Sequence, residues 1–127
     1  MEHPSILVVD DELLIRDLLY DFFQDQGWDI AVAESGEQAL EILEEKKVDV
    51  LLTDLRMPAM DGMALTGQVR KSFPGIPVVI MTGYPSVESA VSALRNKVAD
   101  YITKPFNVNE LYKRVESHLP REDEETA

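Results

Sequence analysis

The sequence of 127 residues contains no cysteine, which excludes disulfide bonds, thiolate nucleophiles and thiolate metal sites. Long apolar runs are also missing, since no stretch approaches the roughly 20 apolar residues that a membrane-spanning helix needs. Residues 1–5 have no basic start followed by an apolar run, so no secretory signal is indicated. These absences predict a soluble, cytoplasmic protein without membrane contacts.

Positive charge is scarce. Twelve Lys and Arg residues face 24 Asp and Glu residues, for a net charge of −12. Proteins that bind nucleic acids use a positive surface to displace counterions from the phosphates, so we expect no direct nucleic-acid binding. Most of the acidic side chains are expected to form a solvated surface.

Hydrophobic residues make up 45% of the chain, enough for one domain with a core of its own. Short apolar runs rich in β-branched residues alternate with helical patterns. Three of these runs are nearly continuous, as in strands buried on both faces of a parallel sheet, and two are weaker, as in edge strands. The five predicted strands are 6–9, 30–32, 48–52, 78–81 and 101–102.

Helical patterns separate these strands, and most have a start or stop signal. Gly27 ends the first, Ser35–Gln38 predicts a capping box for the second, and Asn107 with Glu110 predicts a cap for the fifth. The alternation predicts an α/β fold with right-handed crossovers. The apolar positions behind the five helices are Leu14, Leu18 and Phe22 with Ile15, Leu19 and Phe23 beside them; Ala39, Leu40 and Leu43; Leu65 and Val69; Val87, Ala90, Val91 and Leu94; and Leu111, Val115 and Leu119.

Polar residues follow four of the five predicted strands. Asp10-Asp11-Glu12 comes after the first, Asp54 after the third, Thr82 after the fourth and Lys104 after the fifth. In open α/β sheets, ligands bind beyond the carboxyl ends of the strands. We therefore expect these side chains to share one site.

Three carboxylates at one edge repel one another and raise one another's pKa unless a cation compensates. Asp10, Asp11 and Asp54 suit Mg²⁺ (or Mn²⁺), which prefers oxygen ligands. A lone Asp is more often a helix cap, and Asp11 could cap the first helix, but an acidic pair with a third acid favours a metal site. Lys104 as a phosphate partner and the Thr82 hydroxyl, each unremarkable alone, complete a site for phosphoryl transfer to a carboxylate.

Four segments together resemble the response-regulator receiver domains of two-component signalling. The segments are 8–12, 52–62, 81–83 and 101–106. The resemblance implies a flavodoxin-like three-layer sandwich, with a five-stranded parallel sheet of order 2-1-3-4-5 and five helices. It covers residues 4–120, which are the expected receiver domain, and leaves residues 121–127 as an acidic tail expected to be disordered.

The resemblance also implies individual roles. Asp54 is similar to the phosphoacceptor, Thr82 to the switch hydroxyl, and Tyr101 to the aromatic residue that moves inward when Thr82 engages the phosphoryl group. Lys104 is similar to the phosphate-binding lysine and is expected to precede a cis Pro105. The implied metal ligands are Asp10, Asp11, Asp54 and the backbone carbonyl of Arg56.

The implied function is a signalling switch that receives a phosphoryl group from a histidine kinase or a phosphotransfer protein. It later loses the group to water and turns over no other substrate. We expect output through the face of the fourth helix, fifth strand and fifth helix, toward a downstream effector or a homodimer. The residues expected on or near that face are Arg95, Lys97, Tyr112 and Lys113.

An enzyme of flavodoxin-like or phosphatase type and an interaction module remain as other interpretations of the same fold at this point. A flavin binder would need a Ser, Thr and Gly-rich loop after the first strand, and a small-molecule phosphatase would need its nucleophile there, whereas the isolated acid Asp54 follows the third strand. A receiver-like interaction module that is never phosphorylated would be indicated by loss of Asp54, Thr82 or Lys104, and all three are present.

Overall fold

The computed structural model describes residues 3–120, so the predicted tail at 121–127 lies outside the described residues. Within them, five strands alternate with five helices, as the sequence pattern predicts. No helix among these residues has the length and apolar character needed to cross a bilayer. The elements are β1 (Ser5–Val9), α1 (Leu13–Asp25), β2 (Asp29–Ala33), α2 (Gly36–Glu45), β3 (Val50–Asp54), α3 (Gly62–Ser72), β4 (Val78–Thr82), α4 (Val87–Arg95), β5 (Asp100–Thr103) and α5 (Val108–Ser117).

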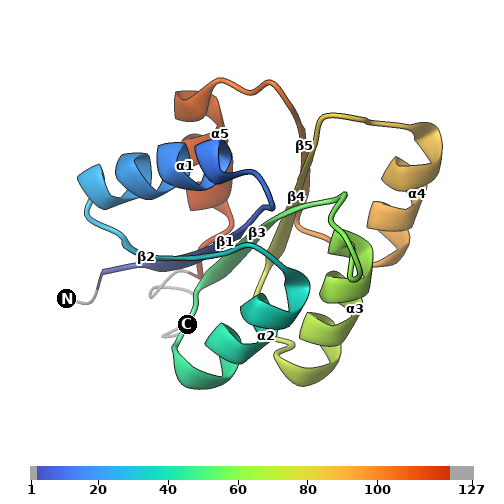
Figure 1. Cartoon of the computed structure of the whole chain (residues 1–127), viewed down its shortest axis with the longest axis horizontal. Helices are drawn as coiled ribbons and strands as arrows, with labels where there is room; N and C mark the ends of the chain where they lie inside the picture. The colour runs from blue at the N-terminus through green and yellow to red at the C-terminus, as the bar shows by residue number, and fades with distance from the viewer. Residues whose placement is uncertain (1–2, 121–127) are drawn as a thin grey trace.

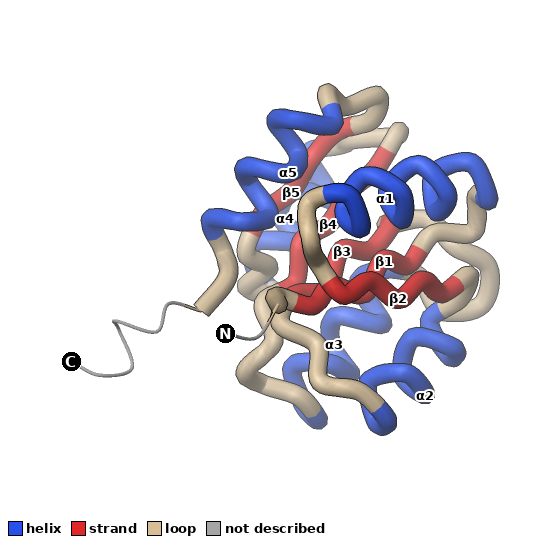
Figure 2. The backbone as a smooth tube through the Cα atoms, turned by 90° about the vertical axis from the view of Figure 1, so that its left-hand side faces the viewer, coloured by secondary structure: helices blue, strands red, loops and turns tan. Residues whose placement is uncertain are grey.

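The strands form one parallel sheet in the order β2-β1-β3-β4-β5, which confirms the predicted topology. Helices α1 and α5 cover one face, and α2, α3 and α4 cover the other (Figure 1). The view in Figure 2 shows the sheet between these two layers. The weaker strand patterns, β2 and β5, lie at the edges, where burial on both faces is incomplete.

Each face of the sheet has its own apolar core. Alternate residues of the central strands point to opposite faces, so Leu7 and Val9 pack toward α2 and α3 while Ile6 and Val8 pack toward α1 and α5. All residues of β3 and β4 are buried. This double burial explains why both strands read as continuous apolar runs.

Tyr112 contributes to the second core, and its predicted place on the output face is wrong. Its hydroxyl accepts a hydrogen bond from Trp28 Nε1 at 3.0 Å, and its ring contacts those of Phe22 and Phe23. The periodicity of α5 does not distinguish the side that faces α1 from the side toward the β5 edge of the sheet, so the sequence could not decide this orientation.

Side chains cap four of the five helices, and the caps at Ser35 and Asn107 were predicted. Ser35, Asp61, Ser86 and Asn107 each accept a hydrogen bond from a backbone N–H of the first turn. The predicted box at Ser35 is only half formed, because the Gln38 side chain accepts from Glu34 N rather than from the cap residue.

Two helices expose apolar side chains that helical periodicity alone would place in a core. In α1, Leu19 and Phe23 are buried, whereas Leu14 on the neighbouring stripe is 81% exposed. In α4, Ala93 is the one buried residue, and Val87 and Leu94 are exposed. Helix α4 is therefore held to the sheet by few apolar contacts.

Candidate functional site

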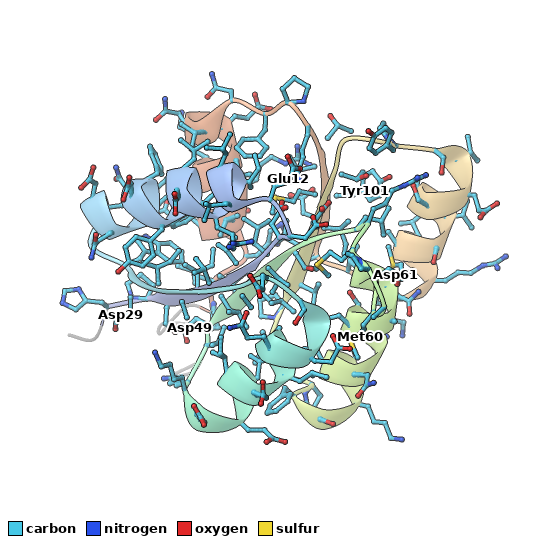
Figure 3. All side chains as sticks on the ribbon, viewed as in Figure 1. Glu12, Asp29, Asp49, Met60, Asp61 and Tyr101 are labelled. Carbon is cyan, nitrogen blue, oxygen red and sulfur yellow. The ribbon has the colours of Figure 1, made fainter. Side chains whose placement is uncertain are left out.

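The candidate site lies at the carboxyl edge of the sheet, where adjacent strands deliver Asp10 and Asp54. Asp10 directly follows β1 and is 0% exposed, and Asp54 is the last residue of β3 and is 6% exposed. Figure 3 shows the neighbouring Glu12 at this edge, at the opposite end of the sheet from Asp29 and Asp49. The pairing of β1 with β3 brings the two buried carboxylates together.

Lys104 reaches this pair from the end of β5, which is separated from β1 by β3 and β4. Its Nζ lies 2.8 Å from Asp10 Oδ2, 3.4 Å from Glu12 Oε1 and 3.6 Å from Asp54 Oδ1. A backbone hydrogen bond from Lys104 N to Thr82 O, at 2.7 Å, fixes the start of its loop. The Lys104–Pro105 peptide bond is cis, as expected.

The loop after β1 is organised around Asp10. Its Oδ1 accepts from Glu12 N at 2.8 Å, and its backbone carbonyl accepts from the Arg16 guanidinium at 2.7 Å. Glu12 caps α1 without a side-chain hydrogen bond. Asp11, which was also considered as a helix cap, is exposed.

Among the described residues, the acids that come together are Asp10, Glu12 and Asp54, with one carboxylate oxygen from each lying within 4.8 Å of the others. The structure thus adds Glu12 to the predicted set, while Asp11 lies at the margin. The sequence placed Glu12 at this edge without indicating it as a metal ligand, and its contact with Lys104 could not be predicted because Lys104 is distant in the sequence. The available signal in the sequence was that Glu12 directly follows the acidic pair Asp10-Asp11.

Crowding at this edge shifts the protonation of the buried groups. Burial, and then the charge of Asp10, raise the pKa of Asp54 to about 6 despite the opposing effect of Lys104. Burial likewise raises the pKa of Asp10, and its hydrogen bond from Lys104 only partly offsets this. The pKa of Lys104 is raised by its acidic neighbours, which outweigh its own burial.

The donor set fits a hard divalent cation. Three carboxylates facing one ammonium leave two net negative charges when all are ionised, which equals the charge that Mg²⁺ would supply. The oxygens are anionic and converge, as magnesium sites require. Arg56 lies next to them, and its backbone N–H stabilises the Asp54 carboxylate.

The loop that follows Asp54 needs glycine at one position. A Cβ on Gly62 would lie 2.4 Å from the backbone oxygen of Asp54, so any side chain there would displace the strand end. Gly62 N also donates to Leu55 O at 2.8 Å, and Thr66 Oγ1 donates to Gly62 O at 2.7 Å. The first turn of α3 therefore packs directly against the end of β3.

Thr82 and Tyr101 lie beside the site on β4 and β5. Thr82 is fully buried, and its Oγ1 accepts from Tyr84 N at 3.0 Å. The Arg56 guanidinium lies over the Tyr84 ring, 5.0 Å from its centre. Tyr101 projects between β5 and α4 (Figure 3), and its hydroxyl contacts Ser89 at 2.5 Å.

Comparisons with known proteins agree with this geometry. A family model described as the response regulator receiver domain matches residues 6–116. The chain is 41% identical over 118 residues to the transcriptional regulatory protein ZraR of Escherichia coli K12, covering 93% of this chain and 27% of that protein. It is 38% identical over 125 residues to the DNA-binding transcriptional regulator NtrC of the same strain, covering 98% of this chain and 27% of that one.

Solved structures show the same fold. A response regulator protein from Thermotoga maritima, TrrA, in complex with Mg²⁺ and BeF matches with a TM-score of 0.82 and 34% identity, covering 91% of this chain and 99% of that one. A CheY-like receiver domain protein from Methanospirillum hungatei matches with a TM-score of 0.88 and 28% identity, covering 91% and 93%. The chain spans about a quarter of the length of its curated relatives. By sequence and by fold, this chain belongs to the response regulator receiver domain family.

Proposed function

We propose that this domain is a phosphorylation switch in which Asp54 accepts a phosphoryl group from a histidine kinase or a phosphotransfer protein. The observation that carries the proposal is the position of Asp54 at the end of a strand. Its Oδ1 lies 3.6 Å from Lys104 Nζ, and the same ammonium group forms an ion pair with Asp10. A carboxylate nucleophile beside a lysine ammonium suits phosphoryl transfer, in which catalysis is mostly positioning and charge neutralisation.

In the proposed step, an oxygen of ionised Asp54 attacks phosphorus. A new O–P bond forms while the P–N bond to the donor imidazole breaks, and the imidazole nitrogen keeps the electron pair. Lys104 Nζ, which contacts Asp54 already, is placed to bind an oxygen of the incoming group. Water later attacks phosphorus and releases inorganic phosphate, which restores the carboxylate.

The proposed metal ligands are Asp10, Asp11, Asp54 and the carbonyl of Arg56, with Mg²⁺ as the ion. When bound, the ion supplies positive charge next to the phosphoryl oxygens. Asp10 already lies in the cluster. Glu12 contacts Lys104 in the present arrangement, and we propose it as an outer member that orients this lysine.

The output is proposed to pass through Thr82 and Tyr101 to the face of α4, β5 and α5. A phosphoryl oxygen that draws the Thr82 hydroxyl toward Asp54 would open space for the Tyr101 ring. Exposed Val87 and Leu94 on α4, with Arg95 beside them, form an apolar and basic surface for an effector or a second copy. The partner's identity and the activity of any longer protein are part of this proposal.

Labelling with acetyl phosphate tests the proposal. We expect intact-mass measurement to show one added phosphoryl group in the presence of Mg²⁺, and none in excess chelator or in Asp54→Asn. Asp100→Asn, which changes a carboxylate at the other end of β5, is the matched control and should label normally. Equal labelling with chelator, or undiminished labelling of Asp54→Asn, would refute the assignment. A chain that folds and never labels would instead be an interaction module.

A further inference from the structure

Tyr101 is bound to the first turn of α4 through one residue, Ser89. The two hydroxyl oxygens lie 2.5 Å apart, and Ser89 is half-buried at the third position of the helix. The Tyr101 label in Figure 3 lies between β5 and α4. Tyr101, the aromatic residue proposed to move on activation, is therefore hydrogen-bonded to α4. This helix must shift if the proposed output face of α4, β5 and α5 is to change its shape.

Ser89 has a second role in the same place, since it forms one half of the capping box of α4. Its backbone N–H donates to Ser86 Oγ at 3.0 Å, and its Oγ accepts from Ser86 N at 3.2 Å. The Ser89 hydroxyl also donates to Ser86 O at 3.1 Å. With that proton used within the cap, the bond to Tyr101 is best satisfied with the Tyr101 hydroxyl as donor.

Few other contacts hold this turn. Val87 is 83% exposed, and Ala93, more than a turn after Ser89, is the one buried residue of α4. Elements with few buried apolar contacts have low local stability. A single hydrogen bond therefore has a larger share in placing the start of α4 than it would have in a well-packed helix.

The sheet register shows what the Tyr101 ring must give up to move. Tyr101 pairs with Ile80, and Thr82 pairs with Thr103, so Tyr101 and Thr82 lie on the same face, two residues apart along the strands. A ring that moves toward Thr82 would leave its present position along β5, in which its hydroxyl bonds to Ser89. The bond to Ser89 thus favours the arrangement in which Tyr101 lies against α4.

We propose that Ser89 is a positioning residue whose hydroxyl holds Tyr101 against α4 through their hydrogen bond. When the switch is activated, this hydrogen bond breaks, and the capping box of α4 is no longer tied to Tyr101. This inference rests on the proposed function, because it needs a switch with two arrangements. The Ser89 hydroxyl raises the population of the inactive arrangement and lowers the apparent affinity for a phosphoryl group or its mimic. Loss of one neutral hydrogen bond should raise that affinity about two- to tenfold.

The test is a titration with beryllofluoride and Mg²⁺, followed by NMR, on Ser89→Ala, Tyr101→Phe and the double variant. Both single changes delete the same bond, so each should bind the mimic about two- to tenfold more tightly, and the double variant no more tightly than either. Ser89→Thr keeps the hydroxyl and should bind like the wild type. Ser92→Ala, which changes a half-buried serine in the next turn of the same helix, is the matched control and should also leave the affinity unchanged.

Hydrogen exchange adds a readout of the helix itself. The Ala90 amide, which bonds to Ser86 O at 3.0 Å, should exchange faster in Tyr101→Phe, which keeps the capping-box side chains, and in wild type with beryllofluoride. Unchanged or weaker binding in both single variants, or additive effects in the double variant, would overturn the inference while leaving the switch intact. Wild type that does not bind beryllofluoride, or binding that persists in Asp54→Asn, would instead refute the proposed function.

Discussion

Strand β5 begins and ends in an ion-pair cluster, and the two clusters have opposite charge balances. At the amino end, Asp100 receives the Arg114 guanidinium on both carboxylate oxygens and His118 Nε2 at 3.2 Å. Burial raises the pKa of Asp100, but the hydrogen bonds from Arg114, His118 and the Tyr101 N–H outweigh it, so the pKa is lowered. The Asp100 carboxylate therefore has hydrogen-bond donors on both oxygens, and its negative charge is compensated.

At the carboxyl end the balance is reversed. One lysine, Lys104, serves Asp10, Glu12 and Asp54 together, and the pKa of both buried carboxyl groups is raised. Strand β5 thus separates the Asp100 cluster, which stabilises the fold, from the Lys104 cluster, in which negative charge is not fully compensated. Uncompensated negative charge is not expected in an ion pair that only stabilises the fold. It is expected in a site that binds a cation and a phosphoryl group.

The largest expected effect comes from removing the charge of Asp54. Its pKa in the folded state, about 6, exceeds the ordinary 3.8, so the folded state binds the proton more tightly than the unfolded chain. The associated stability is present below about pH 4 and is lost as the pH rises through about 6. Asp54→Asn should therefore raise the free energy of unfolding by up to about 3 kcal/mol at about pH 7.5 without metal, and by little at about pH 4.

Urea unfolding of both proteins at the two pH values measures this difference. Asp21→Asn, an exposed acid on α1, is the control and should show no such pH-dependent gain. If Asp54→Asn raised the free energy of unfolding equally at both pH values, removal of charge would not be the cause. The proposed difference in charge balance between the two ends of β5 would then be contradicted.

The amino end should respond with the opposite dependence on pH. Arg114→Ala removes the main partner of Asp100 and should lower the free energy of unfolding by about 1–2 kcal/mol near neutral pH, discounted because the Arg114 side chain is 39% exposed. The lowered pKa of Asp100 means that this stabilisation is present above its ordinary pKa and is lost as the pH falls through the folded value. The cost of Arg114→Ala should therefore shrink in acid.

The same urea series measures this second effect, with Arg70→Ala as the control because Arg70 is an exposed arginine in the last turn of α3. If Arg114→Ala cost as much in acid as at neutral pH, its role would be packing rather than charge. The two ends would then differ in burial alone.

The fold and the centre of the site were predictable from the sequence for one reason. Buried parallel strands give continuous apolar runs, and the residues that follow them meet at one edge. Asp10, Asp54 and Lys104 each follow a strand, and the structure brings them together. The predicted roles of these residues in phosphoryl transfer remain predictions.

What the sequence could not give depends on packing between distant segments. Periodicity marks an apolar stripe on a helix without saying which neighbour covers it, so Tyr112 was assigned to the wrong side of α5 and exposed Leu14 could not be told from buried Leu19. The contacts of Glu12 with Lys104 and of Ser89 with Tyr101 were not predicted, for a related reason. Each side chain is positioned by a residue far along the chain, Lys104 for one and Tyr101 for the other.

The last effect predicted for this comparison is stabilisation by Mg²⁺. An ion that binds the native carboxylates and not the unfolded chain should add about 1.4 kcal/mol at ten times its dissociation constant, measured as a rise in melting temperature that excess chelator reverses. Asp11→Asn should reduce this rise, although Asp11 is exposed, because Asp11 is one of the proposed ligands. Asp100→Asn should keep the full rise, since its carboxylate is already occupied by Arg114 and His118. An equal rise in Asp11→Asn and wild type would exclude Asp11 as a ligand, and a rise lost in Asp100→Asn would place the ion at the wrong end of β5.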